Sequence, residues 1–263
     1  MPELARLCWE EARDALARAR LAILAAGSCE QHGPHMTLDS DLAIAEALAR
    51  RLAGDLGADA VLCPSVGYGL SEHHLGFHGT LTLRPETFVR LLSDVVESLA
   101  HWGLRRVLVV NGHGGNIDAL RLLARQARRD HGVLVAAVMW AQLAADEAAR
   151  HAAGPRYGHA CEIETSLGMA LAPQTVRRER IGPPGDLPSR EPLGEPPFPR
   201  VDLAVPLHEW TRTGAVGDAR KASLQIGEAV ARTAHERALA FARRFATQPL
   251  PGVSPGVSPG EGA

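Results

Sequence analysis

The sequence predicts an α/β fold built on a mostly parallel central sheet of at least four strands, and two observations lead to this prediction. Short apolar runs, several of them rich in β-branched residues, alternate along the chain with longer amphipathic segments. The apolar runs are bounded by Gly, Pro or Asn, which is typical of buried strands. Because strand–helix–strand units run parallel, we expect helices on both faces of one sheet.

The strands are predicted at residues 21–26, 60–64, 107–110 and 133–139. A helix follows the first strand, with Ser40 as its cap and an end near Gly54. A second helix opens at Pro85 and stops at Gly103. Its inward stripe is predicted to be Phe88, Leu91, Val95, Leu99 and Trp102.

Three further helices complete the prediction. One is capped by Asn116 and ends at Gly132, one covers residues 160–172, and the last covers residues 219–246. Residues 177–206 are rich in Pro, Gly and charge and are predicted to be an irregular surface excursion. We expect residues 1–246 to form a single domain and residues 247–263 to be a disordered tail.

Composition narrows the class of partner. The chain of 263 residues carries a formal net charge of -2, which gives no reason to expect nucleic acid or an anionic membrane as partner. No apolar run reaches the length of a membrane span, and acidic residues precede the first apolar run, unlike in a signal peptide. The four cysteines lack CxxC spacing, so we expect reduced thiols and a cytoplasmic protein.

Histidines and acids gather just after the predicted strand ends. Residues 27–35 read GSCEQHGPH, and Asp39 and Asp41 follow. Glu30 and His32 are two residues apart, so in an extended stretch they face one side and can grip one metal region. Carboxylate with imidazole suits Zn²⁺, Mn²⁺ or Fe²⁺. A turn with solvated polar groups is the alternative for this segment.

A second segment, NGHGGN at residues 111–116, directly follows a predicted strand. A glycine-rich turn there can be a dinucleotide loop, but the spacing does not match GxGxxG. His113 fits better as a metal ligand. A third segment, HACEIETS, occupies residues 159–166. Glu162 and Glu164 differ by about 200° around a helix, so only one faces a given site, and the segment alone reads as a capped helix with exposed acids.

Together, these three motifs in this order resemble the creatininase (creatinine amidohydrolase) family over roughly residues 20–240. YGLSEHHLGFHGT at residues 68–80 and GAVGDAR at residues 214–220 are also similar to its pattern. The resemblance implies a three-layer α/β/α sandwich, a homohexamer and two divalent metals. By motif position it implies Glu30, His32, Asp41 and His113 as ligands, with Asp41 bridging the metals.

The chain departs from creatinine-hydrolysing members of the family at one place. Those members carry Tyr-Glu after the Asn-Gly-His turn, where this chain has Gly114 and Gly115, which cannot ligate a metal. The missing carboxylate is predicted to come from Glu164. The glycine pair implies a wider pocket, and the tryptophan that creatinine hydrolases carry near His159 is absent, so the resemblance does not favour creatinine as substrate.

The expected metal chemistry and the motif positions together suggest a catalytic residue and a substrate-binding set. His159 is predicted as the general acid/base, with helix capping or a supporting hydrogen bond as the alternative. Substrate contact is predicted for Ser71, His73, Gly114 and Gly115. Whether His35, His74 and His78 line the pocket or are structural is left open.

We therefore expect a metal-dependent hydrolase that cleaves an amide-type C–N bond of a small molecule, such as a cyclic amide or a formamide. A metallopeptidase that trims a short peptide, as in mycofactocin maturation, is an alternative. The remaining alternative is a non-catalytic small-molecule binding protein, which would hold metal only substoichiometrically.

Overall fold

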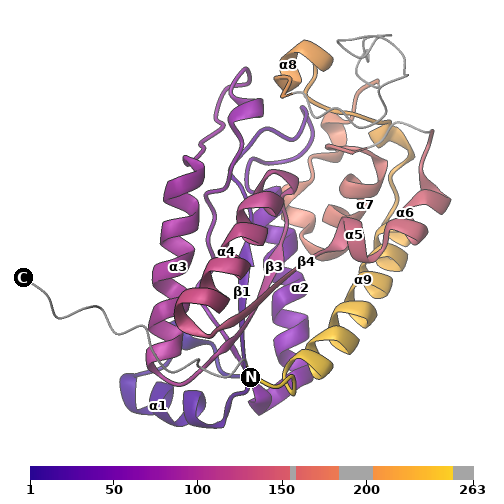
Figure 1. Ribbon diagram of the computed structural model, residues 1–263. Coiled ribbons are helices and arrows are strands. Elements are labelled where there is room, and N and C mark those ends of the chain that lie inside the picture. The colour runs from indigo at the N-terminus through magenta and orange to yellow at the C-terminus, as the bar shows by residue number, and fades with distance from the viewer. Residues whose placement is uncertain (155–157, 184–203, 251–263) are drawn as a thin grey trace, which may run out of the picture.

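The computed structural model describes residues 1–154, 158–183 and 204–250. Its described part is a three-layer α/β/α arrangement around one parallel sheet, as predicted (Figure 1). The sheet contains β1 (Leu21–Ala26), β2 (Ala60–Leu62), β3 (Arg106–Asn111) and β4 (Leu134–Met139) in the order β2-β1-β3-β4. Each neighbouring pair is parallel, and the register places Ala26 of β1 beside Asn111 of β3. The loops after these two central strands therefore emerge side by side.

Successive side chains of β1 point to opposite faces of the sheet and belong to two separate hydrophobic clusters. Leu21 and Ile23 pack with α2 (Ser40–Leu56), α7 (Glu162–Leu171) and α9 (Leu224–Phe245). Ala22 and Leu24 pack with α1 (Trp9–Arg18), α3 (Pro85–His101) and α4 (Ile117–His131). Every residue of β1 is buried, which is why the strand is apolar throughout instead of alternating with polar residues.

The predicted inward stripe of α3 is confirmed at Phe88 and Leu99 and wrong at Leu91 and Trp102. The buried residues of this helix are Phe88, Val89, Leu92, Val96 and Leu99. Leu91 and Trp102 are exposed, at 38% and 65%. The helix is apolar over so wide an arc that spacing alone admits two stripes, and packing against the sheet selects one of them.

Of two predicted helix caps, Ser40 is wrong by one residue, and Asn116 is confirmed in position but makes no capping hydrogen bond. The helix after β1 begins at Ser40 itself, with Asp39 at the cap position, and the Ser40 hydroxyl donates to the Thr37 carbonyl at 2.6 Å. Asn116 precedes α4 but makes no capping bond. Its side chain instead accepts from the Leu70 amide at 3.0 Å and donates to the Gly27 carbonyl at 3.1 Å, so it joins three loops at the end of the sheet.

The remaining elements are short. They are α5 (Trp140–Leu143), α6 (Ala145–His151) and α8 (Leu207–Trp210). The last predicted helix, at residues 219–246, is divided into a 3-10 turn at Ala219–Lys221 and α9. Most of the predicted surface excursion, residues 184–203, and most of the predicted tail, residues 251–263, lie outside the described residues. Within the described part of the chain, no helix is long and apolar enough to cross a membrane.

Candidate metal centre at the carboxyl ends of the strands

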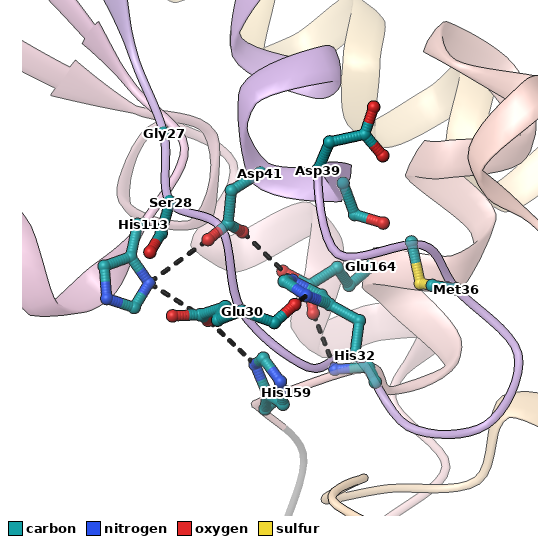
Figure 2. Close-up of polar contacts among 12 residues, drawn as sticks. Gly27, Ser28, Glu30, His32, Met36, Asp39, Asp41, His113, His159 and Glu164 are labelled. Atoms are coloured by element: carbon teal, nitrogen blue, oxygen red, sulfur yellow. Dashed lines mark hydrogen bonds and ion pairs between the residues drawn. The ribbon is translucent and has the colours of Figure 1, made fainter. Parts of the chain in front are cut away.

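The five predicted metal ligands converge at the edge of the sheet where β1 and β3 end (Figure 2). Glu30 and His32 lie in the loop after β1, and His113 is the second residue after β3. Asp41 is the second residue of α2, and Glu164 lies in the first turn of α7. All five side chains are buried, at 4% exposure or less.

Asp41 lies at the middle of this centre. Its Oδ1 is 3.1 Å from Nε2 of His32, and its Oδ2 is 3.2 Å from Nδ1 of His113. The same Nδ1 is 3.2 Å from Oε1 of Glu30. The ligand atoms therefore form two groups that can each hold a cation, one of Glu30, Asp41 and His113 and one of His32, Asp41 and Glu164. Asp41 belongs to both groups and turns a different oxygen to each histidine.

Backbone carbonyls fix the protonation of the ring nitrogens. Nδ1–H of His32 donates to the Glu30 carbonyl at 3.1 Å, and Nε2–H of His113 donates to the Leu70 carbonyl at 2.8 Å. Because a carbonyl can only accept, the other nitrogen of each neutral ring carries a lone pair, and this lone pair faces the carboxylates. Histidines that bind metals in proteins are held in this way.

Two carboxylate oxygens in the centre, Glu30 Oε1 and Asp41 Oδ2, are buried without a hydrogen-bond partner. Buried polar atoms of this kind are rare in folded proteins. Both oxygens face Nδ1 of His113. Two negative oxygens and a ring nitrogen in one buried space need positive charge among them, from a proton or from a metal ion, and this set of oxygen and nitrogen donors fits a divalent metal.

The raised pKa values of two histidines in the centre also indicate that the site favours positive charge. Burial opposes the charge on His32, but the Asp41 carboxylate outweighs it and raises the pKa of His32 to about 10. Burial likewise opposes charge on His113, yet Glu30 and Asp41 hold its pKa well above the usual value. Burial raises the pKa of Glu164 to about 7. Protons or metal ions can supply this charge.

His159 borders the same centre from the loop before α7 (Figure 2). Its Nε2–H donates to the Gln31 carbonyl at 2.6 Å, which leaves the lone pair on Nδ1, 3.8 Å from Oε1 of Glu30. Burial, with His32 beside it, lowers the pKa of His159 to about 3, so the ring is neutral at physiological pH. Its Nδ1 can accept a proton, and with Glu30 and His32 it forms a third group that can hold a cation.

The four predicted substrate-binding residues lie in different surroundings. The Ser71 hydroxyl is fully buried and donates to Oε2 of Glu30, so it orients that carboxylate. His73 is half-buried and stacks on His113 with ring centroids 5.7 Å apart. Gly114 is exposed and borders open space, whereas a side chain at Gly115 would lie 2.2 Å from the Leu70 carbonyl oxygen. Position 115 therefore requires glycine, because the backbone at Leu70 approaches it too closely for a side chain to fit.

The three histidines left open by the sequence have separate places. His74 is buried beside the centre, with Nε2 3.5 Å from Oε1 of Glu30, and its Nδ1 accepts from the Gln31 side-chain amide at 2.8 Å. His35 is buried away from the ligand groups against the Thr165 hydroxyl, at 2.9 Å. His78 is exposed. The 3-10 turn Glu72–His74 determines that His74 is buried while its neighbour His73 is only half-buried. The spacing of the histidines in the sequence does not predict this difference.

Taken alone, the third motif (residues 159–166) predicts a capped helix with exposed acids, and this prediction is wrong. Glu162 is 0% exposed and Glu164 is 4% exposed. Glu164 turns to the metal centre, whereas Glu162 accepts backbone hydrogen bonds elsewhere. The two acids do face different sites, as the helical angle between them predicts.

Comparison with known proteins shows which chains this one is similar to. The family model described as creatinine amidohydrolase (Creatininase) matches residues 5–242. The chain is 36% identical over 168 residues to the mycofactocin precursor peptide peptidase of Mycolicibacterium smegmatis, covering 61% of this chain and 62% of that protein. It is 33% identical over 219 residues to the protein of the same name from Mycobacterium tuberculosis, covering 79% of this chain and 78% of the relative.

The fold is similar to solved structures as well. A crystal structure of creatinine amidohydrolase (creatininase) superposes with a TM-score of 0.73 at 26% sequence identity, covering 92% of this chain and 97% of that one.

Proposed function

This chain belongs to the creatininase family, and we propose that it hydrolyses an amide-type C–N bond with divalent cations held at the centre described above. The proposed ligands are Glu30, His32, Asp41, His113 and Glu164. The observation that carries the proposal is the pair of buried oxygens on Glu30 and Asp41 that lack a hydrogen-bond partner and face Nδ1 of His113.

We propose two cations, because two groups of ligand atoms share Asp41 and the remaining ligands divide between them. A donor set of nitrogen and oxygen without thiolate suits Zn²⁺, Mn²⁺ or Fe²⁺. When bound, such cations lower the pKa of water to about 7 and polarise the carbonyl of the bond to be cleaved.

His159 is the proposed general acid/base. Its Nε2–H is held by the Gln31 carbonyl, so protons are accepted and released at Nδ1, which faces the centre. An amide nitrogen leaves poorly as an anion, and a proton delivered from Nδ1 makes it a neutral amine. The positive ring formed between these steps is stabilised by the neighbouring Glu30 carboxylate.

For substrate contact, the placements support His73 and Gly114. His73 is half-buried over His113, and Gly114 borders open space next to that ligand. The side chain of Ser71 and the Cα of Gly115 contact protein groups instead. The space beside Gly114 favours a substrate with more bulk at this position than a tyrosine there would admit.

A second candidate is a peptidase that trims a short peptide. The two relatives at 36% and 33% identity both carry the name mycofactocin precursor peptide peptidase, and a peptide bond is an amide-type C–N bond. The same residues serve either substrate. A homohexamer and a cytoplasmic location remain proposals based on the family resemblance and on the unpaired cysteines.

Elemental analysis of the purified protein, paired with a panel of lactams, formamides and dipeptides, tests the proposal. We expect about two divalent cations per chain and turnover of at least one class of amide. Turnover confined to dipeptides supports the peptidase. Substoichiometric metal with binding but no turnover, even after Zn²⁺, Mn²⁺ or Fe²⁺ is added back, contradicts an enzyme and supports a binding protein.

A further inference from the structure

A further buried carboxylate, that of Glu162, lies two residues from the proposed ligand Glu164 without belonging to the centre. Glu162 is the first residue of α7 and is 0% exposed. Among the described residues, the groups that can hold a cation do not include it, although they include Glu164 two residues later. A buried carboxylate is costly unless its oxygens are hydrogen-bonded, so its hydrogen-bond partners indicate its role.

Each oxygen of Glu162 holds a different loop. Oε1 accepts the backbone N–H of Ala153 at 2.6 Å, and Oε2 accepts the backbone N–H of Asp218 at 2.8 Å. Hydrogen bonds to an ionised acceptor are about twice as strong as neutral ones. One side chain therefore ties together the chain before the His159 loop, the start of α7 and the segment at residues 214–218.

The contact with Asp218 depends on a tight approach. Gly217 has φ +138°, and a Cβ at this position would lie 2.8 Å from Oε2 of Glu162 and 2.6 Å from Cβ of Cys161. Any other residue at position 217 would push the Asp218 N–H away from the carboxylate. The backbone is thus shaped to bring this donor to Glu162.

The segment held by Glu162 is paired directly with His159. The Val216 amide donates to the His159 carbonyl at 2.7 Å, and the Gly158 amide donates to the Val216 carbonyl at 3.1 Å. The residue after His159, Ala160, has φ +47°, a left-handed conformation that costs about 1 kcal/mol outside glycine. Such a conformation persists where surrounding contacts over-determine it.

We infer that Glu162 is the positioning residue of His159, fixing the backbone from which the imidazole reaches the metal centre. Glu162 belongs to none of the ligand groups found among the described residues. It acts through Asp218 and the isolated β-bridge between Val216 and His159. The inference rests on the proposed function, in which Nδ1 of His159 transfers a proton.

The kinetic test combines Glu162→Gln with His159→Ala, using whichever amide of the panel the wild-type enzyme cleaves fastest. A glutamine keeps the volume but turns an amide N–H toward one of the two backbone donors, so one link is lost. We expect Glu162→Gln to retain its metal content, to lower kcat about 10- to 100-fold, and to change KM by less than about threefold. The double variant is expected to be no slower than His159→Ala alone.

A structural readout needs no substrate. In hydrogen–deuterium exchange, Glu162→Gln is expected to accelerate exchange in the peptides that contain His159 and Asp218. The control Asp146→Asn, an exposed carboxylate paired with Arg237 away from the centre, is expected to change neither exchange there nor kcat. If Glu162→Gln does not fold, Glu162→Asp replaces it, because the shorter side chain cannot span both donors.

The outcomes separate the two proposals. Loss of metal in Glu162→Gln, or a fall in kcat that multiplies with that of His159→Ala, overturns the positioning role. Unaltered exchange and kcat in Glu162→Gln also overturn it. If His159→Ala leaves kcat unchanged, the proposed proton transfer is wrong, while faster exchange in Glu162→Gln still supports the positioning of the His159 backbone.

Discussion

Single side chains in this protein serve two purposes at once. One oxygen of Glu164 accepts the amide of Ala160 at 2.6 Å, while its carboxylate also belongs to the ligand group of His32 and Asp41. The carboxylate thus joins the metal centre to the left-handed residue that follows His159. A metal ligand that is also a backbone anchor is held in one orientation before any cation arrives.

This double role makes Glu164→Gln informative. The glutamine oxygen can still accept the Ala160 amide, but its NH₂ group cannot ligate a cation. We expect the variant to fold, to retain about one cation instead of two, and to lose turnover. Elemental analysis and activity on the amide panel measure both effects.

Glu162→Gln is the matched control for metal content, since it alters a neighbouring buried carboxylate that belongs to no ligand group within the described part of the chain. It is expected to keep both cations. If Glu164→Gln also keeps both, Glu164 is not a ligand and the assignment of the second cation is wrong.

At the scale of elements, the packing of α3 shows how one helix face is selected. Phe88 is 0% exposed in the cluster formed with β1, β3 and α4, while Trp102 is 65% exposed and contacts His101, with ring centroids 4.8 Å apart. Both are large apolar residues on the stripe predicted from spacing. Only Phe88 packs into the cluster against the sheet.

This difference predicts opposite effects of two truncations. Phe88→Ala is expected to lower the free energy of unfolding by about 3–5 kcal/mol, because it removes buried apolar surface and leaves a cavity. Trp102→Ala is expected to change it by less than about 0.5 kcal/mol. Urea denaturation measures both. Similar losses in the two variants would contradict the burial pattern of α3.

At the scale of the whole molecule, the metal centre joins parts of the chain that are far apart in sequence. Its ligands come from the loops after β1 and β3 and from the first turns of α2 and α7. Without cations, the carboxylates of Glu30, Asp41 and Glu164 share one buried space. Like charges in such a space oppose folding unless positive charge is supplied.

Metal removal therefore has a predicted effect on stability. A cation present at 100 to 1,000 times its Kd stabilises the folded state by about 3–4 kcal/mol, so a chelator is expected to lower Tm by about 5–15 °C. Calorimetry measures the change, and adding the metal back is expected to reverse it. Asp41→Asn, which removes the shared ligand, is expected to show a much smaller response. An unchanged wild-type Tm would contradict a cation at this centre.

Much of this molecule follows from its local patterns. The four strands and the main helices are placed by apolar runs, by Pro85 at a helix start and by Gly132 in a left-handed stop. The proposed ligand positions follow from motif resemblance, and the structure brings all five together. Hydrophobic period and turn chemistry act over a few residues, and so does the spacing of a motif.

Other features depend on contacts between distant segments. Loops that meet only in the folded chain decide three of these features. They place His74 beside Glu30, orient Ser71 toward the Glu30 carboxylate and bury Glu162. The sequence by itself determined the elements of the sheet and the chemical character of the centre. The tertiary structure decided which face of each element is buried and which of two adjacent acids or histidines turns toward the centre, because these choices depend on packing and hydrogen bonds across the fold.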